Sequence, residues 1–116
     1  MSVTPADFLN VAEHIESTGT DESCFRSVIS RAYYAAYHRS VEVFPATKYN
    51  GGGMHKEYIS SLLNNPLGSL PRKIGVTLKF LYDKRLLADY DLQLDIKLTD
   101  AKMQIASGKQ LFKLLK

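Results

Sequence analysis

The stretch Ser30-Arg31-Ala32-Tyr33-Tyr34-Ala35-Ala36-Tyr37-His38 lies in the middle of the longest helical pattern in the chain, which runs from about residue 21 to residue 44. Pro45 follows it, and a proline ends a helix because it lacks an N–H group and its ring clashes with the preceding turn. The apolar residues of this segment recur at three- and four-residue spacing, so they predict one buried stripe along a helix. The stripe consists of Phe25, Val28, Ile29, Ala32, Ala36 and Val43.

Helical patterns also fill the chain on either side, between short breaks at residues 17–20, 50–53 and 64–71. A first helix is expected to begin at Thr4, a short third helix after the glycines, a fourth near Ser69 and a last one at Thr99. Their expected inner faces are Phe8, Leu9, Ala12 and Ile15; Tyr58, Ile59, Leu62 and Leu63; Ile74, Leu78, Leu81 and Leu87; and Leu111, Phe112, Leu114 and Leu115.

Residues 89–98 are the ambiguous segment, because their apolar residues alternate as in a strand. No second strand pattern exists to pair with them, so we expect an extended or irregular connection. The fold class is therefore predicted as all-α, an antiparallel bundle of about five helices that forms a single domain over residues 1–116.

The composition is that of an ordinary globular domain, with 45% hydrophobic and 23% charged residues among 116. A single cysteine, Cys24, cannot form an internal disulfide, which favours a reducing compartment. No apolar run approaches the roughly 18 residues that span a bilayer. The first ten residues also lack a signal-peptide pattern. We therefore expect a cytoplasmic protein without a membrane contact.

The net charge of +3 permits a polyanionic partner without requiring one. Positive residues gather toward the end of the chain, where only Asp100 opposes Lys97, Lys102, Lys109, Lys113 and Lys116. Such lysines either line solvated helix faces or form a basic surface that attracts phosphates.

Arg31 and His38 are the pair that suggests chemistry. Residues seven apart return to the same helix face with only about 20° of drift, and they lie roughly 10 Å apart along the axis. A second copy of the helix, packed antiparallel across a two-fold axis, would bring two arginines and two histidines into one cleft. This geometry predicts a homodimer.

Such a cleft suits RNA cleavage without a metal or another cofactor. Histidine transfers protons near neutral pH, and arginine holds phosphate oxygens in a bidentate fork. His38 would deprotonate the ribose 2′-hydroxyl or protonate the leaving 5′-oxygen, while Arg31 stabilises the transition state. The structural alternative is that His38 makes a polar packing contact and that Arg31 pairs with Glu22 or Glu42. The neighbouring tyrosines are expected to be half-buried packing residues.

Residues 30–38 resemble the signature of the HEPN superfamily, an arginine and a histidine separated by four to six residues. The segments Met54-His55-Lys56-Glu57-Tyr58-Ile59 and Arg85-Leu86-Leu87-Ala88-Asp89-Tyr90-Asp91 are similar to the prokaryotic stand-alone branch. The resemblance covers the chain from about residue 21 onward. It implies a helical bundle that dimerises through the motif helix. It also implies a metal-independent endoribonuclease, often a toxin or a phage-defence effector, that leaves 2′,3′-cyclic phosphates.

The resemblance assigns Arg31 and His38 to the catalytic pair. Tyr34, Arg39 and His55 are expected to line the cleft or to bind RNA. Ala32 departs from active members, which often carry a polar residue directly after the arginine. Asp89 is expected to orient Arg31 or to hold His38 protonated if it reaches the cleft. The three dispersed histidines show no metal-site spacing.

The alternative is a non-catalytic HEPN module that binds RNA, a nucleotide or a protein partner. The resemblance suggests a nucleotidyltransferase or an antitoxin as that partner, with Tyr90 as a candidate acceptor of a modification. Ala32 favours this alternative, whereas the intact Arg31 and His38 pair favours the enzyme. A helical bundle that only mediates assembly would explain the core pattern but not the shared face of Arg31 and His38.

Overall fold

A computed structural model describes residues 2–45 and 53–116. Those residues form five helices and no strand: α1 (Pro5–Thr18), α2 (Glu22–Val43), α3 (Met54–Leu63), α4 (Leu70–Tyr90) and α5 (Leu98–Leu114). The predicted all-α class is confirmed. The predicted loop at residues 50–53 lies outside the described residues except for Gly53, which precedes α3 with a φ of 88°.

The helix boundaries follow from local capping. Thr4 and Asp7 form a reciprocal capping box at the start of α1, with Pro5 in the first turn. The Asp21 side chain accepts a hydrogen bond from the N–H of Cys24 at the start of α2. The helix starts predicted at Thr4 and at about residue 21 agree with these caps. Helix α5 begins at Leu98, one residue before the predicted Thr99.

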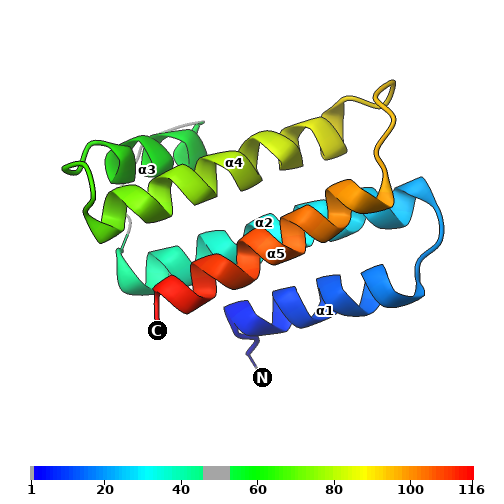
Figure 1. The fold of residues 1–116 in the computed structure, drawn as a ribbon, viewed down its shortest axis with the longest axis horizontal. Helices are drawn as coiled ribbons and strands as arrows, with labels where there is room; N and C mark the ends of the chain where they lie inside the picture. Colours follow the sequence, from blue (N-terminus) through cyan, green and yellow to red (C-terminus); the bar gives the residue numbers. More distant parts are fainter. Residues whose placement is uncertain (1, 46–52) are drawn as a thin grey trace.

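Helices α2 and α5 pack side by side and run in the same direction, while α1 and α4 flank them and run the opposite way (Figure 1). Short α3 packs against the first half of α4. The bundle is therefore antiparallel between α1 and α2 and between α4 and α5, whereas the central pair is parallel.

The core has two neighbouring parts that share α2 and α5. One lies toward α3 and α4 and includes Tyr33, Tyr58, Leu78 and Leu111. The other lies toward α1 and includes Val28, Ala35 and Ile105. Tyr33 and Tyr37 are buried, rather than half-buried as expected. Two residues predicted for the inner faces, Val43 and Leu87, are exposed to 37% and 38%, because each lies close to a helix end where the neighbouring helix no longer covers it.

Helices α3 and α4 approach closely at Gly75. A Cβ atom at this position would lie 3.0 Å from Cβ of Leu62 and 3.1 Å from the backbone nitrogen of Leu63. The glycine therefore sets the distance between these helices, and any larger side chain would push them apart.

The connection between α4 and α5 is irregular, as predicted, but it is shorter than residues 89–98, because Asp89 and Tyr90 belong to α4. Ile96 anchors the connection in the core, with 6% of its surface exposed. Arg26 of α2 donates hydrogen bonds to the carbonyls of Ala88 (2.9 Å) and Asp91 (3.0 Å). Its Nε pairs with Glu22 at 3.0 Å. One guanidinium thus caps the end of α4 and holds the turn that follows it.

None of the helices in the described part of the chain is both long and apolar enough to cross a bilayer.

Candidate active site

Arg31 and His38 lie on the exposed side of α2. The opposite side of this helix is fully buried at Ile29, Ala36 and Ser40 and faces the interior of the bundle. Both motif side chains are exposed. The Arg31 Nε donates a 3.3 Å hydrogen bond to the Ser27 hydroxyl one turn earlier, and no ion pair involves Arg31 within the described residues. Its guanidinium group is therefore available to an anion.

Phe8 of α1 lies beside the cavities of both Arg31 and His38. Its ring stacks on the His38 imidazole, with the centroids 5.4 Å apart and the planes at 26°. Phe8 also lines a shallow cavity of about 210 Å³ beside Arg31 and a larger one of about 430 Å³ beside His38. The edge of α1 therefore forms one wall of the candidate site.

Arg85 of α4 forms the opposite wall, together with Tyr34 and Asp89. Its Nη2 donates to the Tyr34 hydroxyl at 2.9 Å. Its Nε lies 2.8 Å from a carboxylate oxygen of Asp89 as an ion pair, although this buried N–H is not aligned for a hydrogen bond. The Ser30 hydroxyl donates to the same carboxylate oxygen at 3.2 Å.

The cation that Asp89 orients is therefore Arg85. Neither Arg31 nor His38 contacts Asp89 within the described residues, so Asp89 does not bind the motif residues that were expected to depend on it. Burial opposes the charge of Arg85, but Tyr34, Asp89 and Tyr90 together raise the pKa of its guanidinium group above the ordinary value. Tyr34 thus lies between a fixed cation and His38, whose ring is 6.3 Å from the tyrosine ring.

His55, at the start of α3, lies behind this wall. Its Nδ1 is 2.7 Å from the Tyr33 hydroxyl, and the tautomer of the ring decides which group donates. Its ring centroid is 4.3 Å from that of Tyr37 and 5.8 Å from that of Tyr34. Burial, followed by the charges of Arg85 and His38, lowers the pKa of His55. This shift favours the neutral imidazole, and its ring and Nδ1 contact the tyrosines.

Tyr33 is also kept neutral, because burial raises the pKa of its hydroxyl far above the ordinary value. The Tyr33 and His55 pair is thus a neutral hydrogen bond inside an aromatic cluster. The sequence predicted His55 near the cleft, and the structure gives it contacts with Tyr33, Tyr34 and Tyr37.

Arg39 and Tyr90 lie at opposite ends of this region. Arg39 follows His38 but turns toward α5, where it pairs with Glu42 at 3.0 Å and donates to the Leu115 carbonyl at 2.8 Å. Tyr90, at the end of α4, is 70% exposed, with its ring 5.7 Å from the Arg85 guanidinium. Neither residue lies against His38.

The alternative ion pairs considered for Arg31 are made by other arginines. Glu22 pairs with Arg26 and Glu42 pairs with Arg39, which leaves Arg31 outside both pairs.

Three contributors to the site were not predicted as such: Phe8, Arg85 and Ser30. Phe8 was assigned only to the core, because its position beside His38 depends on how α1 and α2 pack. The arginine and aspartate at positions 85 and 89 are four residues apart on a helix, a spacing that indicates an ion pair. That spacing could have identified Arg85 but not its bond to Tyr34.

The described residues contain no group of three or more histidine, cysteine, aspartate or glutamate side chains arranged to hold a metal ion. Comparisons with family models, with curated proteins and with solved structures gave no significant match.

Proposed function

We propose that the protein is a HEPN-type, metal-independent endoribonuclease whose active centre forms between the α2 helices of a homodimer. The observation that carries the proposal is that Arg31 and His38 are both exposed on one side of α2 and both border Phe8. An uncompensated guanidinium group and an accessible imidazole provide the two chemical functions that RNA cleavage by the 2′-hydroxyl requires.

The two side chains are too far apart along one helix to grip a single phosphate, since seven residues rise by about 10 Å. An isologous interface between antiparallel α2 helices would place Arg31 of one subunit near His38 of the partner subunit. The dimer is therefore part of the proposal, because each active centre would need both chains.

The expected reaction uses no external nucleophile. The imidazole of His38 takes the proton of the ribose 2′-hydroxyl, and the 2′-oxygen then attacks the adjacent phosphorus. The bond from phosphorus to the 5′-oxygen breaks, and that oxygen takes up a proton from water. Arg31 stabilises the negative charge on the phosphorane-like transition state. The products carry a 2′,3′-cyclic phosphate and a 5′-hydroxyl, and DNA would not react because it lacks the 2′-hydroxyl.

Arg85, Tyr34 and His55 have positioning roles in this proposal. The Asp89 and Arg85 pair fixes the Tyr34 hydroxyl, and the Tyr34 ring lies beside His38. The biological setting that we propose is a toxin or a phage-defence effector that cuts cellular RNA and is restrained by an antitoxin.

Incubation of purified protein with total RNA in excess chelator tests the proposal, with the variants Arg31→Ala and His38→Ala beside the parent. His14→Ala is a matched control, because His14 is also exposed but lines neither the cavity beside Arg31 nor the one beside His38. We expect cutting with cyclic-phosphate ends that both motif variants lose and the control retains. Unchanged cutting by His38→Ala would refute the assigned mechanism.

A partner-binding module is the second candidate, favoured by the 70% exposure of Tyr90. A phenol this accessible can act as the acceptor of a nucleotidyl group, with its oxygen attacking the α-phosphate of a nucleoside triphosphate and releasing pyrophosphate. Mass spectrometry of the protein purified with its neighbouring gene products would detect that added mass on Tyr90.

A further inference from the structure

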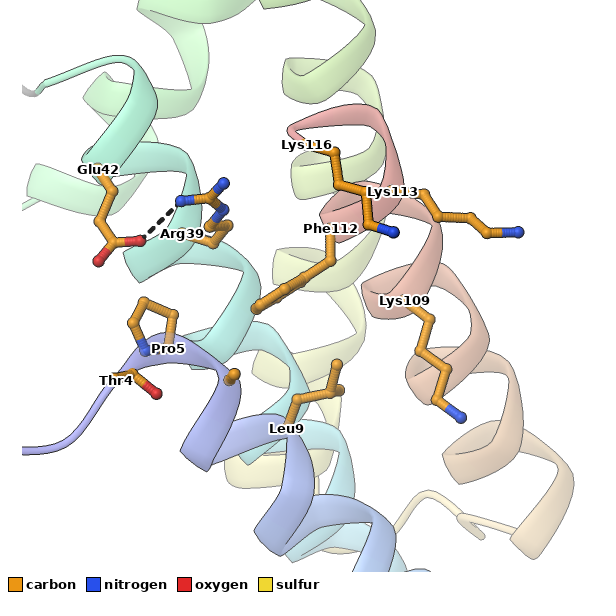
Figure 2. A pocket seen from close by; sticks show the side chains of 10 residues that line it. Thr4, Pro5, Leu9, Arg39, Glu42, Lys109, Phe112, Lys113 and Lys116 are labelled. Carbon is orange, nitrogen blue, oxygen red and sulfur yellow. Dashed lines mark hydrogen bonds and ion pairs between the residues drawn. The ribbon is translucent and has the colours of Figure 1, made fainter.

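A third cavity lies next to the one beside His38, between the beginning of α1 and the ends of α2 and α5 (Figure 2). Its volume is about 460 Å³, which is within the range of small-molecule sites. The floor is apolar, with Leu9 of α1 and the Phe112 ring, which projects from α5 toward α1 and α2.

Four cationic side chains and a single carboxylate surround this floor. Arg39 comes from α2, while Lys109, Lys113 and Lys116 follow α5 and its end at spacings of four and three residues. In Figure 2, Lys116 turns back beside Phe112, and the other two lysines extend outward from α5. We call the cavity lined by Arg39, Lys109, Lys113 and Lys116 the basic cavity.

Two of the four cations are already compensated. Arg39 pairs with Glu42 at 3.0 Å, and Lys109 pairs with Glu13 at 3.2 Å. Within the described residues, Lys113 and Lys116 make no ion pair. The basic cavity therefore has one uncompensated ammonium group near the Phe112 ring, that of Lys116, and a second at its outer edge, that of Lys113. This combination suits a strand with an aromatic base and neighbouring phosphates.

The basic cavity adjoins the His38 cavity. Thr4, Pro5 and Glu42 line both of them. A strand whose scissile phosphate lies at His38 can thus continue over the start of α1 without leaving the surface of the protein. The carboxylate of Glu42 on this path is bound to Arg39, which reduces its repulsion of phosphates.

We propose that the basic cavity is a subsite for the single-stranded RNA substrate, in which Lys113 and Lys116 bind phosphates next to the scissile one and Phe112 contacts a base. This inference rests on the proposed function, because it assumes that RNA is the strand bound at His38. It adds a binding site, remote from the motif residues, that determines how much flanking RNA the enzyme needs.

The test uses a fluorescent single-stranded RNA with 2′-O-methyl groups, which can bind but cannot be cut. Anisotropy titrations over a range of KCl concentrations give the affinity and its salt dependence for the full-length protein. The variant Lys113→Gln/Lys116→Gln is compared with Lys73→Gln/Lys102→Gln. The control pair removes the same charge from exposed lysines that do not line the basic cavity.

Each phosphate contact contributes about 0.7 to the slope of log affinity against log salt for a single strand. Loss of two contacts should therefore reduce the slope by about 1.4 and weaken binding by more than about tenfold at 50 mM salt. The control pair should leave the slope unchanged. An equal slope for both double variants, or no binding by the parent protein, would overturn the proposal.

Binding of 5′-AMP that disappears in Lys113→Gln/Lys116→Gln, with RNA binding unaffected, would identify a free-nucleotide site and would also overturn the strand subsite. A separate experiment shows whether the proposed function itself fails. In that case the parent protein does not cut RNA in excess chelator. Failure of the subsite leaves that cutting intact.

Discussion

The ring of Phe8 stacks on the ring of His38, with 5.4 Å between their centroids. This contact joins α1 to the exposed side of α2, and stacking on the Phe8 ring limits how far the imidazole turns beside its cavity. A proton-transfer group gains from such restriction, because the reacting atoms must be held in line.

Replacement of Phe8 by alanine should therefore lower kcat more than it raises KM, whereas Phe8→Leu should retain part of the rate. The alanine variant should also lose about 2–3 kcal/mol of stability, since Phe8 is only half-buried and full burial would cost more. Steady-state cleavage and urea denaturation of the same preparations measure both effects. An equal loss of kcat in the two variants would argue against a positioning role.

The lowered pKa of His55 predicts that the stability of the folded protein depends on pH. Its pKa in the folded protein is below the value of 6.5 for an unperturbed histidine, chiefly because of burial. The unfolded chain therefore binds more protons between the two pKa values, and stability rises with pH in that interval. Stability should be complete above pH 6.5 and should decrease as the pH falls through the folded pKa of His55.

Urea midpoints between pH 3 and pH 8 check this dependence, with His55→Gln as the comparison. The variant should lose the decrease below pH 6.5 but keep the decrease at more acidic pH. The decrease at more acidic pH comes from two carboxyl groups. The pKa of Asp21 is lowered chiefly by the backbone N–H of Cys24, and the pKa of Glu22 chiefly by its hydrogen bond with Arg26. A parent protein with a flat profile from pH 5 to pH 8 would contradict the neutral state of His55.

Gly75 and Gly108 both lie within helices, and together they allow a matched test of how closely the helices pack. A Cβ atom at Gly75 would lie 3.0 Å from Cβ of Leu62, whereas one at Gly108 would meet Leu9 at an ordinary 3.5 Å. Alanine is favoured over glycine by about 1 kcal/mol in a helix. Overpacking costs about 1–3 kcal/mol and opposes this gain at position 75.

Gly75→Ala should thus be destabilising or neutral, and Gly108→Ala should be stabilising by up to about 1 kcal/mol. Thermal denaturation of both variants measures the difference. A stabilising effect at both positions would mean that α3 and α4 separate without cost.

We predict that the hydrogen bonds of Arg26 to the connection between α4 and α5 stabilise the folded protein. Arg26→Met keeps the apolar stem of the side chain but removes the donors that bind the carbonyls of Ala88 and Asp91. Loss of charge-assisted hydrogen bonds should destabilise the protein by about 2–3 kcal/mol. Hydrogen exchange should show faster exchange at the end of α4, and uniform acceleration across all helices would contradict a local capping role.

The local features of the fold could be predicted from the sequence, because they depend on neighbouring residues. Thr4, Asp21 and Pro45 mark helix ends through capping and proline chemistry, and the seven-residue spacing places Arg31 and His38 on one face. Val43 was assigned wrongly to the core, because periodicity shows the direction of a side chain but not whether a neighbouring helix reaches it.

Contacts between distant segments could not be predicted in the same way. Tyr34 and Arg85 are 51 residues apart, and Tyr33 and His55 are 22 apart. Both bonds depend on the register between helices, which the packing of the whole core determines. The basic end of the chain was visible in the sequence, but the bond of Arg39 to the Leu115 carbonyl at the end of α5 follows from the parallel packing of α2 and α5.

The most direct test of the shared active centre is RNA cleavage by a mixture of Arg31→Ala and His38→Ala proteins, each inactive alone. In a two-fold dimer that pairs Arg31 of one subunit with His38 of the partner subunit, each mixed dimer contains one intact centre. After subunit exchange, an equimolar mixture should recover about one quarter of the parent activity, because about half of the dimers are mixed and each has one centre of two. An inactive mixture, despite mixed dimers demonstrated by differently tagged chains, would contradict the active centre proposed between the two α2 helices.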